Sequence, residues 1–324
     1  MWVDGFTRFH SVCRVGSLAL VDKRPNAPFV PRERPDVLRE IERLDPETGN
    51  ERVAYLSAAY DFAWDTQRAY ELALLRTFAV PKTSKLLVRT REFTERTQKR
   101  YDDTVIIMST IGLCGYSSPE GRAAIRRMNQ IHARYRIPNE EFLYVLSTFM
   151  LETVRWNAKY GWRPLSDNEL QASYVFWREV GRRMNIRDIP GSFAEVEAFS
   201  LAHEREHFAH SADTQLLAEV TRDLFLSWVL PKPLWPLGAE LVYAVLSDEL
   251  LGPFGFPRPK LWARALVEGG LWLRKKVLRR LPPRRRPYRL PPTRTYGEMP
   301  EMSTVGPQPA PEGARAERET SNST

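Results

Sequence analysis

The stretch Arg122–Pro164, RAAIRRMNQIHARYRIPNEEFLYVLSTFMLETVRWNAKYGWRP, contains two helical patterns joined by a short break. The first pattern is basic, and Arg122, Arg126 and Asn129 fall on one stripe by the i, i+4, i+7 rule. The segment Ile137-Pro138-Asn139 interrupts it, and a more apolar pattern follows. Apolar residues recur there at close to helical spacing: Phe142, Val145, Leu146, Phe149, Val154 and Trp156. The sequence therefore predicts two helices that meet at a tight corner.

Further helical patterns lie on both sides of this stretch. They predict helices over residues 36–43, 54–78, 86–101, 103–111, 166–184, 192–210 and on to 229, 235–251 and 261–281. We therefore expect an all-α fold with one mostly helical domain at 36–281. An irregular, proline-punctuated arm precedes it at 1–35, and a tail follows at 282–324 that is first basic, then low in complexity and disordered.

The net charge of +8 comes from one segment of the 324-residue chain. Residues 274–289 hold nine Lys or Arg and no acid, and the remainder is nearly neutral, with 39 basic against 40 acidic residues. Such a segment suits an anionic membrane surface, so we expect peripheral membrane contact there and no specific nucleic-acid partner. The alternative is a basic end that only keeps the fold soluble. Nothing in the sequence fixes the oligomeric state.

The cysteine count and the start of the chain bear on the compartment. Cys13 and Cys114 make neither a disulfide framework nor a metal-ligand spacing, so a reducing compartment is the simpler interpretation. The N-terminal residues do not resemble a secretory signal, and no stretch of ~20 residues is apolar enough to span a bilayer. We expect a cytoplasmic protein, peripheral to a membrane.

Histidines are few, which narrows the search for metal ligands. The segment His203-Glu204-Arg205-Glu206-His207 matches H-E-x-x-H, the pattern by which zinc peptidases hold a metal and a general base. A third ligand is needed and none is evident in the sequence. Glu204-x-x-His207 is also half of a di-iron bundle motif, but the second copy is missing. On the residues alone, His203 and His210 are expected on an exposed helix face.

A series of motifs in order resembles the MpaB branch of a helical oxygenase family that also contains the rubber oxygenases. The motifs are RMNQIHARY at Arg127–Tyr135, RWNAKYGWRPL at Arg155–Leu165, WREVGRRM at Trp177–Met184 and EREHF at Glu204–Phe208. The resemblance covers roughly residues 85–260. The resemblance implies a helical domain that binds haem b and uses dioxygen on an apolar, isoprenoid-like substrate, with oxidative C=C cleavage as the chemistry.

The resemblance also implies residue roles. The axial histidine of the rubber enzymes has no counterpart, because Leu146-Ser147-Thr148 stand at that place. The iron ligand is then His132 or His207, with Asn129 beside the cofactor. An imidazole is a usual axial ligand of haem iron.

Two arginines are the implied catalytic residues. Arg126 and Arg127 stand near the place of polar distal residues in the rubber enzymes, where cationic side chains bind haem propionates or polarise dioxygen. The alternative is that they form buried ion pairs with Glu152 or Glu206.

Two other functions remain open from the sequence. One is a non-catalytic helical protein that docks on lipid through its basic segment. The other is a zinc hydrolase that uses H-E-x-x-H.

Overall fold

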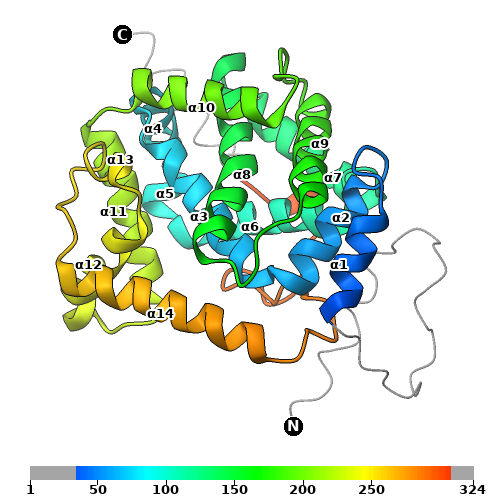
Figure 1. Ribbon diagram of the computed structural model, residues 1–324. Coiled ribbons are helices and arrows are strands. Elements are labelled where there is room, and N and C mark those ends of the chain that lie inside the picture. The colour runs from blue at the N-terminus through cyan, green and yellow to red at the C-terminus, as the bar shows by residue number, and fades with distance from the viewer. Residues whose placement is uncertain (1–33, 308–324) are drawn as a thin grey trace.

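The computed structural model describes residues 34–307, and within that range it contains α-helices, short 3-10 and π turns, and no strand (Figure 1). The predicted all-α fold is confirmed. The expected irregular arm lies outside the described residues, except for Arg34 and Pro35, which begin the first helix. The helices are α1 Arg34–Arg43, α2 Asn50–Leu56, α3 Ala63–Phe78, α4 Pro81–Arg89, α5 Glu92–Glu95, α6 Thr97–Cys114, α7 Pro119–His132, α8 Asn139–Tyr160, α9 Asp167–Arg183, α10 Phe193–His207, α11 Ala212–Ser227, α12 Trp235–Val245, α13 Asp248–Leu251 and α14 Leu261–Arg280.

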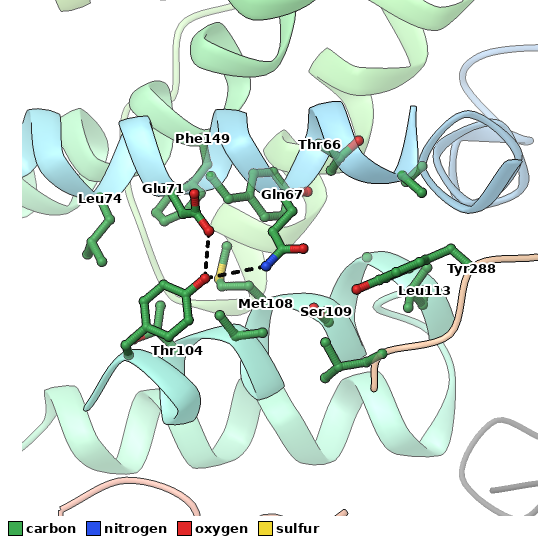
Figure 2. Close-up of a pocket in the computed structure, with 17 residues that line it drawn as sticks. Thr66, Gln67, Glu71, Leu74, Thr104, Met108, Ser109, Leu113, Phe149 and Tyr288 are labelled. Carbon is green, nitrogen blue, oxygen red and sulfur yellow. Dashed lines mark hydrogen bonds between the residues drawn. The ribbon is translucent and has the colours of Figure 1, made fainter. Parts of the chain in front are cut away.

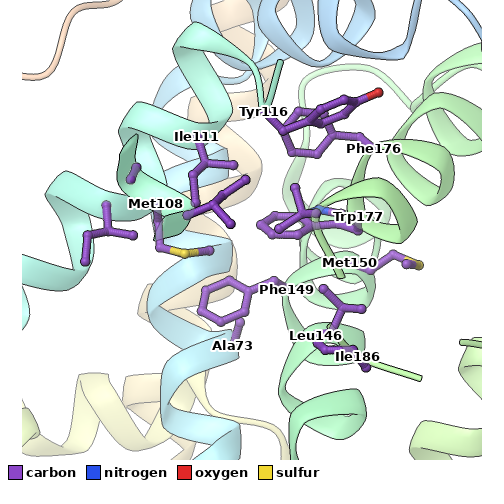
Figure 3. Close-up of a cluster of buried hydrophobic side chains, with 14 of the residues drawn as sticks. Ala73, Met108, Ile111, Tyr116, Leu146, Phe149, Met150, Phe176, Trp177 and Ile186 are labelled. Carbon is purple, nitrogen blue, oxygen red and sulfur yellow. The ribbon is translucent and has the colours of Figure 1, made fainter. Parts of the chain in front are cut away.

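Helix α8 is the centre of the packing. It contacts α3 along much of its length and also contacts α9, α10 and α14, while α6 packs on α7 (Figure 1). The main core lies where α3, α6, α8 and α9 converge (Figure 3). Phe149 of α8 lies 5.7 Å from the ring of Trp177 on α9 and 5.5 Å from that of Tyr70 on α3. The apolar stripe of the second predicted helix therefore faces the core, as its periodicity requires.

Short polar signals set the helix ends. Ser118 accepts a hydrogen bond from Gly121 N at the start of α7, where Pro119 occupies the first turn. Ser166 and Glu169 form the capping box that opens α9, at the start of the helix predicted over 166–184. Asn139 is the first residue of α8. Its side-chain amide donates a hydrogen bond to Arg187 O at 3.0 Å and accepts one from Arg187 N at 2.8 Å.

Three predicted helices are interrupted in the structure, and the one over 235–251 divides into α12 and α13 after Val245. The pattern over 54–78 divides into α2 and α3 at a π turn, η3 Ser57–Asp61. The pattern over 86–101 breaks at Arg91, whose φ of 59° lies in the left-handed region and separates α4 from α5. The apolar run at 103–111 lies inside α6, so its assignment as helix rather than strand is confirmed.

The C-terminal segment 282–307 packs on the helices, so the disorder predicted for the low-complexity part of the tail, from about residue 290, is wrong up to residue 307. Leu290 and Val305 are buried. Tyr288 N donates to Ala59 O at 2.7 Å, and the Tyr296 hydroxyl donates to Asp103 at 2.7 Å. Leu290 lies against residues of α3 and α6, and Val305 O accepts a hydrogen bond from Arg127 of α7. Composition alone does not reveal these contacts. Residues 308–324 lie outside the described range.

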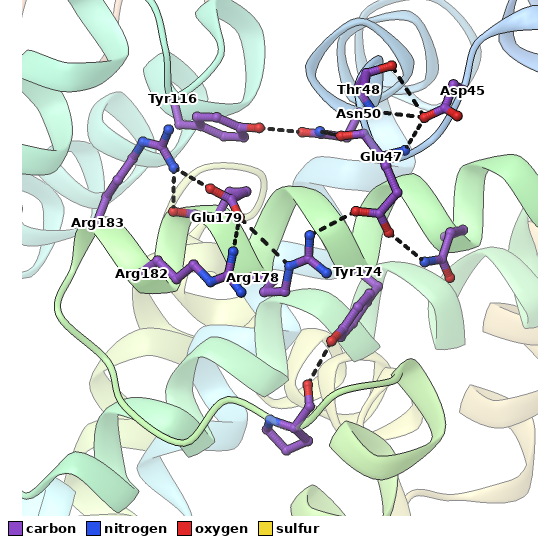
Figure 4. Close-up of polar contacts among 12 residues, drawn as sticks. Asp45, Glu47, Thr48, Asn50, Tyr116, Tyr174, Arg178, Glu179, Arg182 and Arg183 are labelled. Atoms are coloured by element: carbon purple, nitrogen blue, oxygen red, sulfur yellow. Dashed lines mark hydrogen bonds and ion pairs between the residues drawn. The ribbon is translucent and has the colours of Figure 1, made fainter.

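The loop between α1 and α2 is fixed to α9 by polar contacts (Figure 4). Glu47 pairs with Arg178 at 2.9 Å, and Asn50 accepts a hydrogen bond from the Tyr116 hydroxyl at 2.9 Å. Arg183 lies over the ring of Tyr116, 4.1 Å from its centroid. The N-terminal helices are thus attached to the core from the side of α9.

Cys114, the last residue of α6, is disulfide-bonded. The expectation that the cysteines are reduced thiols is therefore wrong for this residue, and Cys13 lies outside the described residues.

A buried arginine connects three helices. Arg76 of α3 pairs with Glu152 of α8 at 3.0 Å and with Glu204 of α10 at 2.8 Å, and all three side chains are less than a tenth exposed. Arg76 also donates to the Ser247 hydroxyl at 3.0 Å. Burial works against the charge on Arg76, but the two carboxylates outweigh it, so the pKa of Arg76 lies above its usual value.

We expect Arg76→Met to destabilise the protein severely. The substitution keeps most of the volume but leaves the two buried carboxylates with only the partly exposed Arg155, 2.9 Å from Glu152 and 3.8 Å from Glu204. Breaking a buried ion pair in this way costs about 3–5 kcal/mol. Arg182→Met is the matched control, because Arg182 is 61% exposed in its pair with Glu179 and such pairs contribute about 0–1 kcal/mol. Urea unfolding of both variants measures the difference. Equal losses of stability in the two variants would contradict the role given to Arg76.

Candidate functional site

Helix α7 places its predicted site residues on different surfaces. Arg126 is exposed to solvent, and Arg127 is half-buried, donating from Nε to Val305 O at 2.6 Å. Asn129 donates to Arg183 O at 2.9 Å and so ties α7 to the end of α9. Among the predicted site residues of α7, Arg127 and His132 therefore face the protein. Arg126 faces solvent, and Asn129 faces the end of α9.

The alternative for the two arginines, burial in ion pairs with Glu152 or Glu206, is wrong. Glu152 pairs instead with Arg76 and with Arg155, the latter at 2.9 Å. Glu206 is exposed.

His132, at the C-terminal end of α7, is held in an environment that keeps its ring neutral. Its ring lies 5.2 Å from that of Phe142 on α8, and its Nδ1 is buried without a hydrogen-bond partner among the described residues. Burial, and then the nearby cation of Arg100 on α6, lower the pKa of His132 to about 4. A neutral imidazole with an unpartnered nitrogen is the form that ligates a metal.

The second histidine group lies on α10 and differs from expectation. His203 is not on an exposed face but is 3% exposed, with its ring stacked on that of Tyr144 at 4.3 Å. His207, one turn later, is partly exposed, and its ring centroid lies 4.2 Å from that of His203. His210 is exposed, as expected. Sequence periodicity around 203–210 is weak because charged residues surround the histidines, so burial of His203 is decided by the docking of α10 on α8.

Glu140, the second residue of α8, faces these two histidines. Its Oε1 lies 3.5 Å from His203 Nδ1 and 4.0 Å from His207 Nε2. Glu140 and Phe142 are two residues apart, about 200° around the helix. His132 and the His203–His207 pair therefore lie against opposite sides of the first turn of α8. The sequence analysis missed Glu140, because nothing local to residue 140 indicates that α10 packs beside it.

Glu204 cannot serve as the general base of a zinc peptidase. Its Oε2 is paired with Arg76, and its Oε1 accepts from the hydroxyls of Tyr144 at 3.5 Å and Ser200 at 3.3 Å. Glu204 follows His203 directly, so it points about 100° away from it around α10 and into the protein. The zinc peptidase and di-iron arrangements both need this carboxylate at the metal, and here it belongs to the buried ion network.

A small cavity lies between α3 and α6 (Figure 2). Its volume is about 70 Å³, and the segment containing Tyr288 and Leu290 closes one side. Its polar wall is Glu71, which accepts a hydrogen bond from the Tyr101 hydroxyl at 2.6 Å. Burial raises the pKa of Glu71, although Arg68 opposes this shift. The cavity is smaller than the roughly 300–1,000 Å³ typical of ligand pockets.

A larger cavity lies beneath α14, on the other side of α3. Its volume is about 420 Å³, within the range of ligand pockets. Arg68 and Glu71 supply its charged groups, and Glu71 also borders the smaller cavity. The other wall residues are mostly aliphatic or aromatic: Trp64, Leu72, Leu75, Trp156, Phe225, Leu241, Val242, Val245, Leu246, Leu266, Val267, Gly270 and Leu271. The arrangement suits an apolar ligand, and His132, His203 and His207 lie outside the walls of both cavities.

The low pKa of His132 makes stability depend on pH. In the unfolded chain the His132 ring takes up a proton near pH 6.5, and in the folded chain it does so only near pH 4. The free energy of unfolding should therefore fall as pH falls through this window, by up to about 1.4 kcal/mol per pH unit from this group. Urea unfolding of the chain from pH 7 to pH 4.5 should show this loss of stability, reduced in His132→Gln and retained in His210→Gln. An unchanged slope in His132→Gln would contradict the burial of a neutral ring.

Comparison with known sequences gives the family. Residues 56–275 match the family described as ER-bound oxygenase mpaB/B'/Rubber oxygenase, catalytic domain. The chain is 28% identical over 233 residues to the ER-bound oxygenase mpaB' of Penicillium brevicompactum, an alignment that covers 66% of this chain and 55% of that protein. It is 27% identical over 212 residues to the ER-bound oxygenase mpaB of Penicillium roqueforti (strain FM164), covering 60% of this chain and 71% of that one.

The chain thus spans about half the length of the first of these relatives. No helix in the part of the chain that the structure describes is both long and apolar enough to cross a membrane. The family match covers well over half of the sequence and contains α3 to α13 entire. The protein therefore belongs to the catalytic-domain family of the ER-bound oxygenases mpaB and mpaB' and the rubber oxygenases.

Proposed function

We propose that the protein is a haem-dependent oxygenase that uses dioxygen on an apolar substrate. The observation that carries the proposal is His132, a half-buried neutral imidazole whose Nδ1 is buried without a partner among the described residues, in a chain of an oxygenase family. His132 would be a better ligand of the haem iron than His207, because His207 shares the Glu140 carboxylate with His203. Bound haem would supply the iron at which dioxygen is activated.

The groups around His132 fit an anionic cofactor. Arg100 lies close enough to depress the pKa of His132, and Arg127 lies on the same helix, one and a half turns earlier. Both are cations that bind carboxylates such as haem propionates. The exposed Arg126 has no part in this arrangement.

The cavity of about 420 Å³ beneath α14 supports an apolar substrate. Aliphatic and aromatic walls exclude water, and Arg68 and Glu71 at one end orient a polar group of the substrate. We propose oxidative cleavage of a C=C bond in an isoprenoid-like chain as the reaction, on the likeness to the rubber oxygenases. The chain's own contribution is to hold the cofactor through His132 and to keep the substrate away from water.

We further propose that α14 docks on a membrane. Ala263 is the one buried residue of α14. Four exposed apolar residues form a stripe along the helix: Trp262, Leu266, Leu273 and Val277, whose exposed fractions are 43%, 58%, 57% and 45%. Leu266 also lines the cavity, so an apolar substrate dissolved in lipid would enter close to its binding place. The helix and the segment after it expose seven basic residues, which favours an anionic surface: Lys276, Arg279, Arg280, Arg284, Arg285, Arg286 and Arg289.

Arg274 is not among the exposed charges of this segment. It makes two contacts of 2.9 Å with the buried Asp65 and lies 4.1 Å from the centroid of the Trp64 ring. It fixes α14 to α3, so membrane binding is best tested by substitution and not by truncation before residue 274.

We expect protein expressed with haem supply to bind one haem b per chain, and His132→Ala to lose it. The absorption spectrum and a pyridine haemochrome assay measure the content. His207→Ala and His203→Ala should keep the haem, since neither ring is the ligand. Full haem content in His132→Ala would remove this residue from the axial position, and a colourless wild-type protein would refute haem dependence.

We expect the chain to co-sediment with anionic vesicles at low salt and to be released at high salt. Trp272→Ser together with Leu273→Ser should weaken binding by removing two exposed apolar groups. Arg284→Gln together with Arg286→Gln should weaken it roughly tenfold or more, at about 1 kcal/mol per basic residue. Leu201→Ser, at a residue 37% exposed on α10, is the control. If this control lowers binding as much as the α14 variant does, the docking surface lies elsewhere.

A further inference from the structure

Two imidazoles and one carboxylate converge between the first turn of α8 and the last two turns of α10. The ligand atoms of Glu140, His203 and His207 all lie within 4.8 Å of one another. The i, i+4 spacing puts both histidines on one face of α10, and Glu140 approaches that face from the neighbouring helix. The three donors thus come from two helices that are packed together, so their mutual placement is fixed by the core.

His203 has no hydrogen-bond partner for either ring nitrogen among the residues that the structure describes, although it is 3% exposed. Buried polar groups ordinarily have partners, and each exception requires a physical reason. The carboxylate of Glu140 lies 3.5 Å from His203 Nδ1 but does not form a hydrogen bond with it. The ring is held in place by its stack on Tyr144, and Phe199 lies 5.9 Å away. A fixed ring with a free nitrogen aimed at a carboxylate is ready to receive a cation.

We propose that Glu140, His203 and His207 bind one divalent transition-metal ion, in a site separate from the one proposed for haem. Two histidines and one carboxylate are the ligand set of catalytic zinc sites and of non-haem Fe(II) sites. Three protein ligands leave positions open for water or another ligand, so this site belongs to the open class and not to the closed structural class.

The observed separations are close to those of a bound ion. Metal–ligand bonds of about 2.0–2.2 Å place neighbouring ligand atoms about 3–3.5 Å apart. The contacts of 3.5 Å and 4.0 Å from Glu140 need only a small inward movement. The Glu140 side chain is 59% exposed and His207 is 26% exposed, so both are free to make it while His203 stays fixed.

The two nearest other carboxylates, those of Glu141 and Glu204, are not available as a general base at this site. Glu141 accepts a hydrogen bond from the Thr83 hydroxyl at 2.8 Å and faces Lys82 at 4.0 Å, so it is already engaged. Glu204 is held by Arg76 and is not available to activate a metal-bound water. The site therefore binds a metal without the general base of a zinc peptidase, which separates metal binding from the hydrolase chemistry that H-E-x-x-H suggests.

The test uses the full-length chain, freed of metal with a chelator, and Co²⁺ or Zn²⁺ as the probe. Wild-type protein should bind one ion per chain by calorimetric titration with Zn²⁺, show visible Co²⁺ absorption bands, and melt at a higher temperature with Zn²⁺ present. Glu140→Gln and His207→Ala should each weaken binding at least tenfold, because each removes one of three ligands. Both side chains are partly exposed, so these variants should fold.

Two nearby variants serve as matched controls. Glu206→Gln and His210→Ala alter exposed residues of the same region outside the cluster, and both should bind Zn²⁺ as the wild type does. The proposal is overturned if the wild type takes up no stoichiometric ion, if neither ligand variant weakens binding, or if the controls weaken it equally.

Haem content measured in the same variants separates this proposal from the haem site. His132→Ala should lose haem and keep Zn²⁺, and Glu140→Gln should do the reverse. Loss of haem in Glu140→Gln or His207→Ala would show that the cluster is the haem site and would overturn both assignments.

Discussion

The buried cation of Arg76 is the interaction on which the arrangement of the helices depends. One guanidinium faces a carboxylate from α8 and another from α10, while its own helix, α3, lies along α8. Removing a charge from water is costly, so a buried arginine is tolerated only when its partners are in place. The network therefore favours the one packing of α3, α8 and α10 in which all three charges meet. The same packing brings His203 and His207 beside Glu140, so both the fold and the proposed metal site rest on it.

Several residues of the family motifs form buried polar contacts that hold the helices together. Trp156 donates to the buried Asp65 at 2.9 Å, and Arg155 pairs with Glu152. Arg163 pairs with Asp61 at 2.7 Å and with Glu169 at 2.6 Å. A motif made of charges that are buried in pairs cannot change one member at a time without leaving the other unpaired. This explains why such motifs identify the family fold, and why they give little information about substrate.

The first turn of α8 separates two different environments. On one side Phe142 packs against His132, a neutral ring near cations that suit an anionic cofactor. On the other side Glu140 faces two histidines and suits a cation. Beneath α14, a third region is apolar and adjoins the stripe proposed to meet a membrane. Ligands of opposite charge and an apolar substrate can thus be accommodated by one helical domain.

The sequence by itself determined the helices and the family. The 3.6-residue periodicity around Phe142 and Phe149, the proline at 138 and the capping box at Ser166 are local signals, and each corresponds to an element of the structure. It also limited the candidate ligands to a few histidines. The tertiary structure alone decided which of them are buried, because burial depends on the partner helix: α10 covers His203 only where it meets α8. The tertiary structure likewise placed Glu140 beside the histidines, Arg126 in solvent, and Leu290 and Val305 in the core. Such contacts join residues that are far apart in the chain, so they leave no local pattern in the sequence.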